Sequence, residues 1–115
     1  MKILREVVFY KNHLTDFLET LPIKTAKKIY WTIDLVRRLN VVPETYLKKL
    51  ADADRLFEIR VEFGGDIFRV FCFFDEGNLV VLTNGFQKKS QRTPRNEIDR
   101  ALRIRDEYYG EKQKH

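Results

Sequence analysis

Residues 56–86 read LFEIRVEFGGDIFRVFCFFDEGNLVVLTNGF, and this stretch decides the fold. It contains three runs rich in β-branched and aromatic residues, a composition typical of β-strands. The runs are Leu56–Phe63, Ile67–Phe74 and Leu79–Phe86. Gly64-Gly65 separates the first two and Asp75-Glu76-Gly77-Asn78 the last two, and both are hairpin signals. The stretch therefore predicts three consecutive antiparallel strands.

The flanking sequence predicts one more strand and three helices. Ile3–Tyr10 has the composition of a strand, while Leu14–Leu21 and Ile23–Leu39 repeat apolar residues at helical spacing. Thr93-Pro94 suits the start of a final helix. The order is β-α-α-β-β-β-α over residues 1–115, which we read as one α+β domain. We expect an antiparallel sheet with helices packed on one of its faces.

Composition narrows the classes of function. The 115 residues carry a formal net charge of +5, which favours a nucleic-acid partner. One cysteine excludes an intramolecular disulfide, and two histidines make a His/Cys metal site improbable, so we expect no metal. No apolar run approaches the roughly 18 residues that span a bilayer. We therefore expect a cytoplasmic protein that makes no contact with membranes.

The short turns predict the register of the strands. A turn at Gly64-Gly65 pairs Phe63 with Asp66 and sets Arg60 opposite Arg69, and a symmetric second turn sets Arg69 opposite Asn84. One face is then almost wholly apolar and needs helices to cover it. Its residues are Phe57, Ile59, Val61, Phe68, Val70, Cys72, Phe74, Leu79, Val81 and Thr83. The other, open face collects Glu58, Arg60, Glu62, Arg69, Phe71, Phe73, Leu82, Asn84, Phe86 and Lys88.

Basic residues gather on this second face. Like charges directly opposite each other in a sheet lower stability by a few tenths to about 1 kcal/mol. The predicted pairing of Arg60 with Arg69 therefore calls for a structural or functional explanation. The segment Gln87–Arg95 adds four basic residues and no acid, which suits an anion-binding edge. Two alternatives stay open: a solvated basic loop, and a surface ion-pair lattice in which Glu58 and Glu62 neutralise both arginines.

A family resemblance rests on three strings of residues. They are Leu56-Phe57-Glu58-Ile59-Arg60-Val61, Phe68-Arg69-Val70-Phe71, and Asn84-Gly85-Phe86-Gln87-Lys88-Lys89-Ser90-Gln91 followed by Thr93-Pro94 and Glu97. Together they resemble the RelE/HigB toxins of the RelE/ParE superfamily, and more narrowly the phage-derived Gp49-like branch. The resemblance covers Leu47 to the end of the last helix, and implies a RelE-like fold.

The resemblance also implies a function. Toxins of this kind enter the ribosomal A site and cleave mRNA there, using the RNA's own 2′-hydroxyl as nucleophile and no metal or cofactor. Arg60 and Arg69 would then stabilise charge on the phosphate, and Lys88 or Lys89 would be the general base or acid. Phe86 would stack on a splayed base. The further RNA-binding candidates are Asn84 and Arg92, with Lys48 and Lys49 as weaker ones.

Two departures from the family pattern concern proton transfer. RelE-type toxins have a functional tyrosine near the C-terminus, where Tyr108 and Tyr109 lie in this chain, and some HigB relatives use histidine, which the predicted sheet lacks. The resemblance implies the ribosome, mRNA and an antitoxin, usually of the helix-turn-helix type, as partners. The alternatives are a ParE-like inhibitor of DNA gyrase and a non-catalytic nucleic-acid-binding module.

Overall fold

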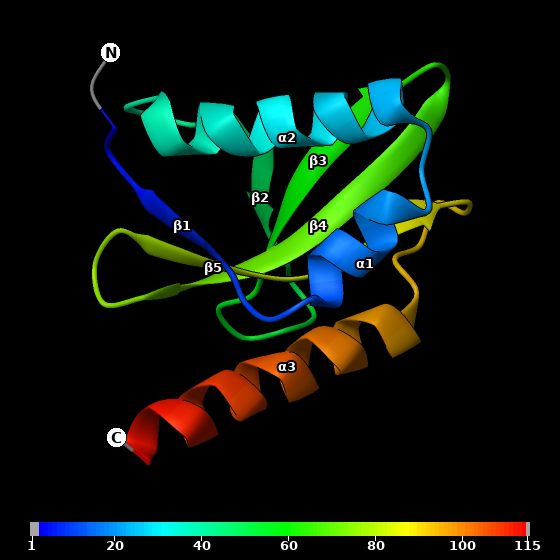
Figure 1. The fold of residues 1–115 in the computed structure, drawn as a ribbon. Coiled ribbons are helices and arrows are strands. Elements are labelled where there is room, and N and C mark those ends of the chain that lie inside the picture. Colours follow the sequence, from blue (N-terminus) through cyan, green and yellow to red (C-terminus); the bar gives the residue numbers. More distant parts are fainter. Residues whose placement is uncertain (1–2, 115) are drawn as a thin grey trace.

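The computed structural model describes residues 3–114 and confirms the α+β class (Figure 1). Five strands form one sheet in the order β1-β5-β4-β3-β2, and there are three helices. The elements are β1 (Glu6–Phe9), α1 (His13–Glu19), α2 (Ile23–Arg38), β2 (Leu47–Lys49), β3 (Phe57–Phe63), β4 (Asp66–Asp75), β5 (Leu79–Lys88) and α3 (Arg95–Gln113). No helix within residues 3–114 combines the length and apolar character needed to cross a membrane.

The two edge strands differ from the prediction. β1 pairs with β5 in parallel, from Glu6 opposite Leu79 to Phe9 opposite Leu82, so the sheet is mixed and a purely antiparallel sheet was wrong. The chain passes through α1 and α2 before it reaches the sheet again, and a long connection of this kind permits a parallel pairing. The three-residue strand β2 was not predicted as a strand, and it pairs with β3 on the other edge.

Helices cover both faces of the sheet, so the prediction that they cover only one face was wrong. α1 and α2 lie on one side, where Leu14, Ile29 and Val36 pack against Ile59 and Val70. α3 lies on the opposite side (Figure 1), and its apolar residues close a second core. That core contains Ala53, Leu56, Phe71, Phe86, Ile98 and Ala101. The aromatic residues of the second face explain the cover, because exposed Phe71 and Phe86 would forfeit the free energy of burial.

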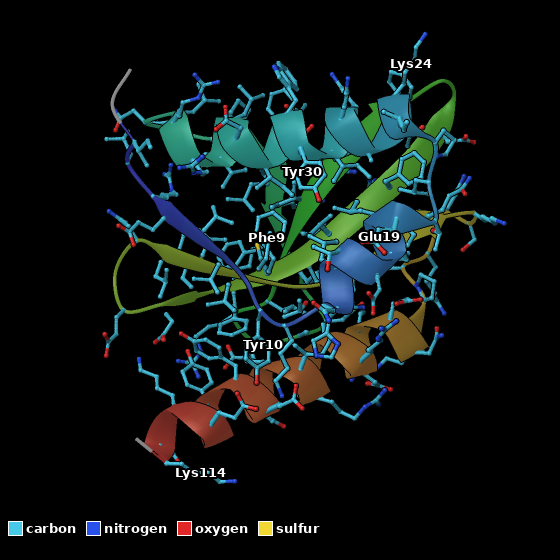
Figure 2. All side chains as sticks on the ribbon, in the orientation of Figure 1. Phe9, Tyr10, Glu19, Lys24, Tyr30 and Lys114 are labelled. Carbon is cyan, nitrogen blue, oxygen red and sulfur yellow. The ribbon has the colours of Figure 1, made fainter. Side chains whose placement is uncertain are left out.

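β1 contacts the helices of both layers through neighbouring aromatic residues. Phe9 lies 5.9 Å from Tyr30 of α2, and Tyr10 lies 5.3 Å from Tyr108 of α3, measured between ring centroids. Figure 2 shows Phe9 on the side of α2 and Tyr10 on the side of α3. Successive side chains of an extended chain point to opposite faces, so Phe9 at the end of β1 and Tyr10 directly after it contact the two helical layers.

The first hairpin has the predicted register. Phe63 pairs with Asp66 and Arg60 with Arg69. Gly64 and Gly65 both have positive φ, at 61° and 83°, which fits the two-residue type I′ turn that hairpins favour. The pairing of the two arginines is therefore a consequence of a tight glycine turn.

The second hairpin has a different register from the prediction. Its turn leaves three residues between Asp75 and Leu79, and a β-bulge sets both Thr83 and Asn84 opposite Phe71. Thr83 Oγ1 donates a hydrogen bond of 3.1 Å to the Phe71 carbonyl at this point. Arg69 therefore pairs with Phe86, and the predicted pairing with Asn84 was wrong. Before the bulge the faces are also exchanged, so that Val80 and Leu82 join the first core in place of Leu79, Val81 and Thr83.

Gly85 allows α1 to approach β5 closely just after the bulge. A Cβ atom at this position would lie 2.8 Å from Leu14 Cδ1 and 2.9 Å from Phe17 Cδ2. Real Cβ contacts are not this short, so a larger residue would push α1 away. The glycine thereby permits the close packing of α1 on β5.

Candidate nucleic-acid interface

Four basic residues from four neighbouring strands lie on the face that α3 partly covers. Lys48 of β2 pairs with Glu58 of β3, and Arg60 of β3 pairs with Arg69 of β4. Lys88 of β5 pairs with Ile67 of β4, which in turn pairs with Glu62 of β3. Paired residues point to the same face, so their side chains gather along one diagonal of the sheet. We call Lys48, Arg60, Arg69 and Lys88 the cationic row.

A single buried carboxylate lies inside the cationic row. Glu58 Oε1 lies 3.7 Å from Arg60 Nε, and Glu58 Oε2 lies 3.7 Å from Arg69 Nε. The Glu58 side chain is only 6% exposed, whereas Glu62 is exposed at the edge of β3. The ion-pair alternative is therefore correct for Glu58, but four cations face two carboxylates and the region stays positive.

Arg69 is the buried member of the row. Its side chain is 4% exposed, compared with 32% for Arg60, and Arg69 Nη1 donates a 3.1 Å hydrogen bond to the Phe68 carbonyl. Burial lowers the pKa of Arg69, which Glu58 counteracts and Arg60 reinforces. A guanidinium stays charged through such a shift, so Arg69 is a fixed positive charge beneath the surface.

Lys88 has a pKa below that of an ordinary lysine. Partial burial is the largest cause that lowers its pKa, and the charge of Arg69 is the next. Arg60 and Lys48 lower the pKa of Lys88 further, while Glu58 opposes them. Lys89 follows the end of β5 and is exposed. Of these two predicted lysines, the structure brings only Lys88 into the row.

Two predicted RNA-binding residues are buried. Asn84 is fully buried, and its Nδ2 donates to Glu97 Oε1 at 3.0 Å and to the Glu97 carbonyl at 3.2 Å. Phe86 is 5% exposed and packs against Phe71 with ring centroids 5.3 Å apart. The expectation that Asn84 and Phe86 contact RNA is therefore wrong for this structure, because α3 covers this part of the face. Both residues instead contact α3 and help to hold it on the sheet.

Two further predicted residues lie apart from the row. Lys49 is exposed and pairs with Phe57, whose side chain packs on the first core, so Lys49 points to the face opposite Lys48. Arg92 is exposed beyond β5, beside a separate hollow of about 380 Å³ that Asp52 and Arg95 also line. Lys49 and Arg92 therefore do not belong to the cationic row.

The C-terminal tyrosines lie at the far end of β4. Tyr108 Oη donates a 2.7 Å hydrogen bond to Asp75 Oδ2, and both tyrosines pack on Phe73. Burial, followed by the bond to Asp75, raises the pKa of Tyr108 to about 12. Tyr108 and Tyr109 thus belong to the turn end of the β4–β5 hairpin, away from Arg69 near the other end of β4.

A groove adjoins the row just before β2 begins, where the edge of β3 is open. Its volume is about 500 Å³. Its lining residues are Lys28, Thr32, Thr45, Tyr46, Arg60, Val61, Glu62 and Arg69. The sequence analysis assigned no role to Lys28 or Tyr46. The helical pattern alone does not reveal which basic residue of α2 faces the sheet edge.

Metal ligands do not gather in the part of the chain that the structure describes. Within residues 3–114, no group of three or more His, Cys, Asp and Glu side chains is arranged to hold a metal ion. Cys72 is fully buried, and burial raises the pKa of its thiol to about 12, so it packs as a small apolar residue. The chemistry available at the row is that of cations, one buried acid and a lysine of lowered pKa.

Comparison with known proteins identifies the family of this chain. No curated protein matches the chain. A family model described as phage-derived protein Gp49-like (DUF891) matches residues 16–106. The match runs from α1 into α3 and includes the cationic row and the groove. The chain therefore belongs to the phage-derived Gp49-like family, a toxin family of toxin–antitoxin systems.

Proposed function

We propose that this protein is a ribosome-dependent endoribonuclease, a toxin of the RelE/HigB kind that cleaves mRNA in the ribosomal A site. The observation that carries the proposal is the cationic row, in which Lys88 has a lowered pKa beside Arg60 and Arg69. Cleavage of RNA through its 2′-hydroxyl needs a base for that hydroxyl and positive charge on the phosphate. The row provides both within one small region of the surface.

Each member of the row has a role in this reaction. Neutral Lys88 accepts the proton of the 2′-hydroxyl as the 2′-oxygen bonds to phosphorus. The bond from phosphorus to the 5′-oxygen breaks, solvent protonates that oxygen, and the products carry a 2′,3′-cyclic phosphate and a 5′-hydroxyl. Arg60, the better exposed arginine, holds the phosphate oxygens. Lys48, which is exposed at the edge strand, contacts a neighbouring phosphate.

Arg69 acts from below the surface. Its side chain is 4% exposed, so it offers little area to RNA. Its charge is the second cause of the lowered pKa of Lys88. Arg69 is therefore a positioning residue in this proposal, and its role is to keep Lys88 ready to accept a proton. Arg69→Lys keeps the charge but loses the planar guanidinium, so it separates the two contributions.

The partner of such a toxin is an antitoxin that covers the positive surface. Four cations against two carboxylates favour an acidic segment as the cover. Binding of that segment over the row would exclude RNA, because the same charges hold both ligands. The antitoxin is expected to be of the helix-turn-helix type by analogy with the RelE/HigB toxins.

The proposal is tested with purified protein, translating ribosomes and a defined mRNA. Cleavage is expected in the A-site codon with the wild-type protein and with Lys89→Gln, the matched neighbouring variant, and is lost with Lys88→Gln. Intact mRNA, together with growth arrest when the protein is expressed, would overturn the proposal. Gyrase-dependent DNA breaks under those conditions would identify the ParE-like activity, and binding without cleavage would identify a nucleic-acid-binding module.

A further inference from the structure

The groove beside the cationic row has two walls from different layers. Tyr46 lies at one side, and its carbonyl accepts a hydrogen bond of 2.8 Å from Arg60 N, which fixes this segment to the edge of β3. α2 forms the other wall through Lys28 and Thr32, and Figure 1 shows α2 lying across β3. The volume of about 500 Å³ lies in the range of about 300–1,000 Å³ that is usual for small-ligand sites.

Trp31 lies beside two of the residues that line this groove, Tyr46 and Lys28. Trp31 is 45% exposed, and its ring lies edge-on to that of Tyr46 with centroids 6.5 Å apart. Lys28 Nζ lies 4.1 Å from the centre of the Trp31 ring. An indole that is packed in neither core and is left half in solvent beside a tyrosine is an exposed aromatic surface. Aromatic surfaces among cations hold single-stranded nucleic acid, because bases stack on the rings and phosphates meet the charges.

The charges of the groove favour a phosphate-bearing ligand. Lys28, Arg60 and Arg69 line it, and Glu62 is the one acid among its lining residues. Arg60 and Arg69 also belong to the cationic row, so the groove and the row share a boundary. A strand of RNA whose phosphate lies on Arg60 and Lys88 would reach the groove with its adjoining nucleotide.

We propose that this groove is a nucleotide subsite for single-stranded RNA, in which a base stacks on the Tyr46 ring beside Trp31 while Lys28 and Arg60 hold the phosphates on either side. The subsite deepens the proposed function, since it names the place of the nucleotide next to the cleaved bond. Glu62 accepts hydrogen bonds from the nucleotide and limits its orientations. Stacking tolerates any base, so the subsite contributes affinity more than sequence preference.

Trp31 is the only tryptophan in the chain, which makes the test direct. A short single-stranded oligoribonucleotide with a 2′-deoxy linkage at each position that could be cut is titrated into the protein without ribosomes. Saturable quenching of tryptophan fluorescence that weakens as salt rises is expected. Unchanged fluorescence with an oligonucleotide that still binds would overturn the subsite, since the RNA would then lie elsewhere.

Matched variants locate the binding within α2 and its neighbours. Anisotropy of a dye-labelled oligonucleotide gives the Kd of each variant. Tyr46→Ala and Lys28→Gln are each expected to raise the Kd about fivefold or more. The controls are Tyr30→Ala and Lys24→Gln on the same helix, since Tyr30 packs beside Phe9 and Lys24 lies at the start of α2 (Figure 2). Wild-type Kd values for both Tyr46→Ala and Lys28→Gln would contradict the subsite.

The outcomes separate the subsite from the proposed function. Quenching and weakened binding in Tyr46→Ala, in a protein that never cleaves mRNA, would keep the subsite and remove the nuclease. Cleavage of mRNA by the ribosome-bound protein, with no change of Kd in the groove variants, would keep the nuclease and remove the subsite. Quenching by an acidic peptide but not by the oligonucleotide would show that the groove binds protein, and would overturn the subsite.

Discussion

Arg60 and Arg69 are direct partners across β3 and β4, yet 32% of the Arg60 side chain is exposed and only 4% of the Arg69 side chain. Glu58 lies 3.7 Å from each of them and is itself buried. The same distance therefore describes two different ion pairs, one open to solvent and one closed to it. Exposed pairs contribute about 0–1 kcal/mol, while breaking a buried pair costs about 3–5 kcal/mol.

The first prediction is that the two arginines differ in their effect on stability. Arg60→Ala is expected to change the free energy of unfolding by about 1 kcal/mol or less, because Glu58 still has Arg69 as its ion-pair partner. Arg69→Ala is expected to lower it by about 3 kcal/mol or more, because Glu58 then stays buried with only the solvent-exposed Arg60 as its ion-pair partner. Urea unfolding measures both. Equal effects would contradict the unequal burial.

The second prediction concerns the pKa of Lys88. Burial lowers that pKa most, and the charges of Arg69 and Arg60 lower it further, so removal of a positive neighbour must raise it. Lysine-selective NMR titration is expected to give Lys88 a pKa below the ordinary value of about 10.4, and a higher value in Arg60→Ala than in the wild type. Lys49, which points to the opposite face, serves as the control resonance. A Lys88 pKa that stays the same or falls in Arg60→Ala would refute the electrostatic account.

The third prediction concerns the stability that Lys88 contributes as pH changes. A lysine whose pKa is lowered by folding binds its proton less tightly in the folded state than in the unfolded state. Its charge therefore destabilises the fold below the folded-state pKa, and that cost disappears as pH rises through this pKa toward the unfolded value. Lys88→Met is expected to unfold at slightly higher urea than the wild type at pH 7. A lower urea midpoint would mean that Lys88 forms a stabilising ion pair.

The fourth prediction concerns the C-terminal tyrosine that the family resemblance singles out. Tyr108 donates its hydroxyl to Asp75 and lies away from the cationic row. Tyr108→Phe is expected to cost about 1–2 kcal/mol of stability through the lost hydrogen bond to a charged group. It should leave mRNA cleavage within about twofold of the wild type when assayed below the unfolding range. A loss of cleavage in the folded variant would show that Tyr108 takes part in the reaction.

The fifth prediction concerns the close approach of α1 to β5. Gly85→Ala places a Cβ against Leu14 and the ring of Phe17, and overpacking of this kind typically costs about 1–3 kcal/mol. Thermal unfolding measures the loss. Phe17→Leu in the same chain gives the alanine more room and is expected to restore part of it. Wild-type stability for Gly85→Ala alone would mean that α1 shifts freely, which the packed core of Leu14 and Leu18 argues against.

The residues explain which parts of this structure the sequence could predict. The register of the first hairpin follows from Gly64-Gly65, since a two-residue turn fixes every pair up to Phe57 and Cys72. The register of the second hairpin does not follow, because the sequence shows neither the three-residue turn nor the extra residue at Thr83-Asn84. A turn of three residues instead of two exchanges the faces as far as the bulge, which is why Leu82 was assigned to the open face.

The candidate site was predictable to a similar extent. Arg60, Arg69 and Lys88 were found by strand alternation, which is a local property of the backbone. The burial of Asn84 and Phe86 depends on α3, a helix whose packing partner cannot be read from its own spacing. Lys48 and Lys49 looked equivalent in the sequence, and only the pairing of β2 with β3 separates them. The sequence therefore did not predict the contacts between elements that are distant in the chain.

The central claim is that the cationic row cleaves mRNA during translation. Mapping the 5′-ends of cellular mRNAs after brief induction tests it most directly, with Lys88→Gln as the inactive variant and Lys89→Gln as its matched control. New 5′-ends inside translated reading frames are expected with the wild type and Lys89→Gln, and none with Lys88→Gln. Unchanged 5′-ends in cells whose growth the wild-type protein has arrested would contradict the claim.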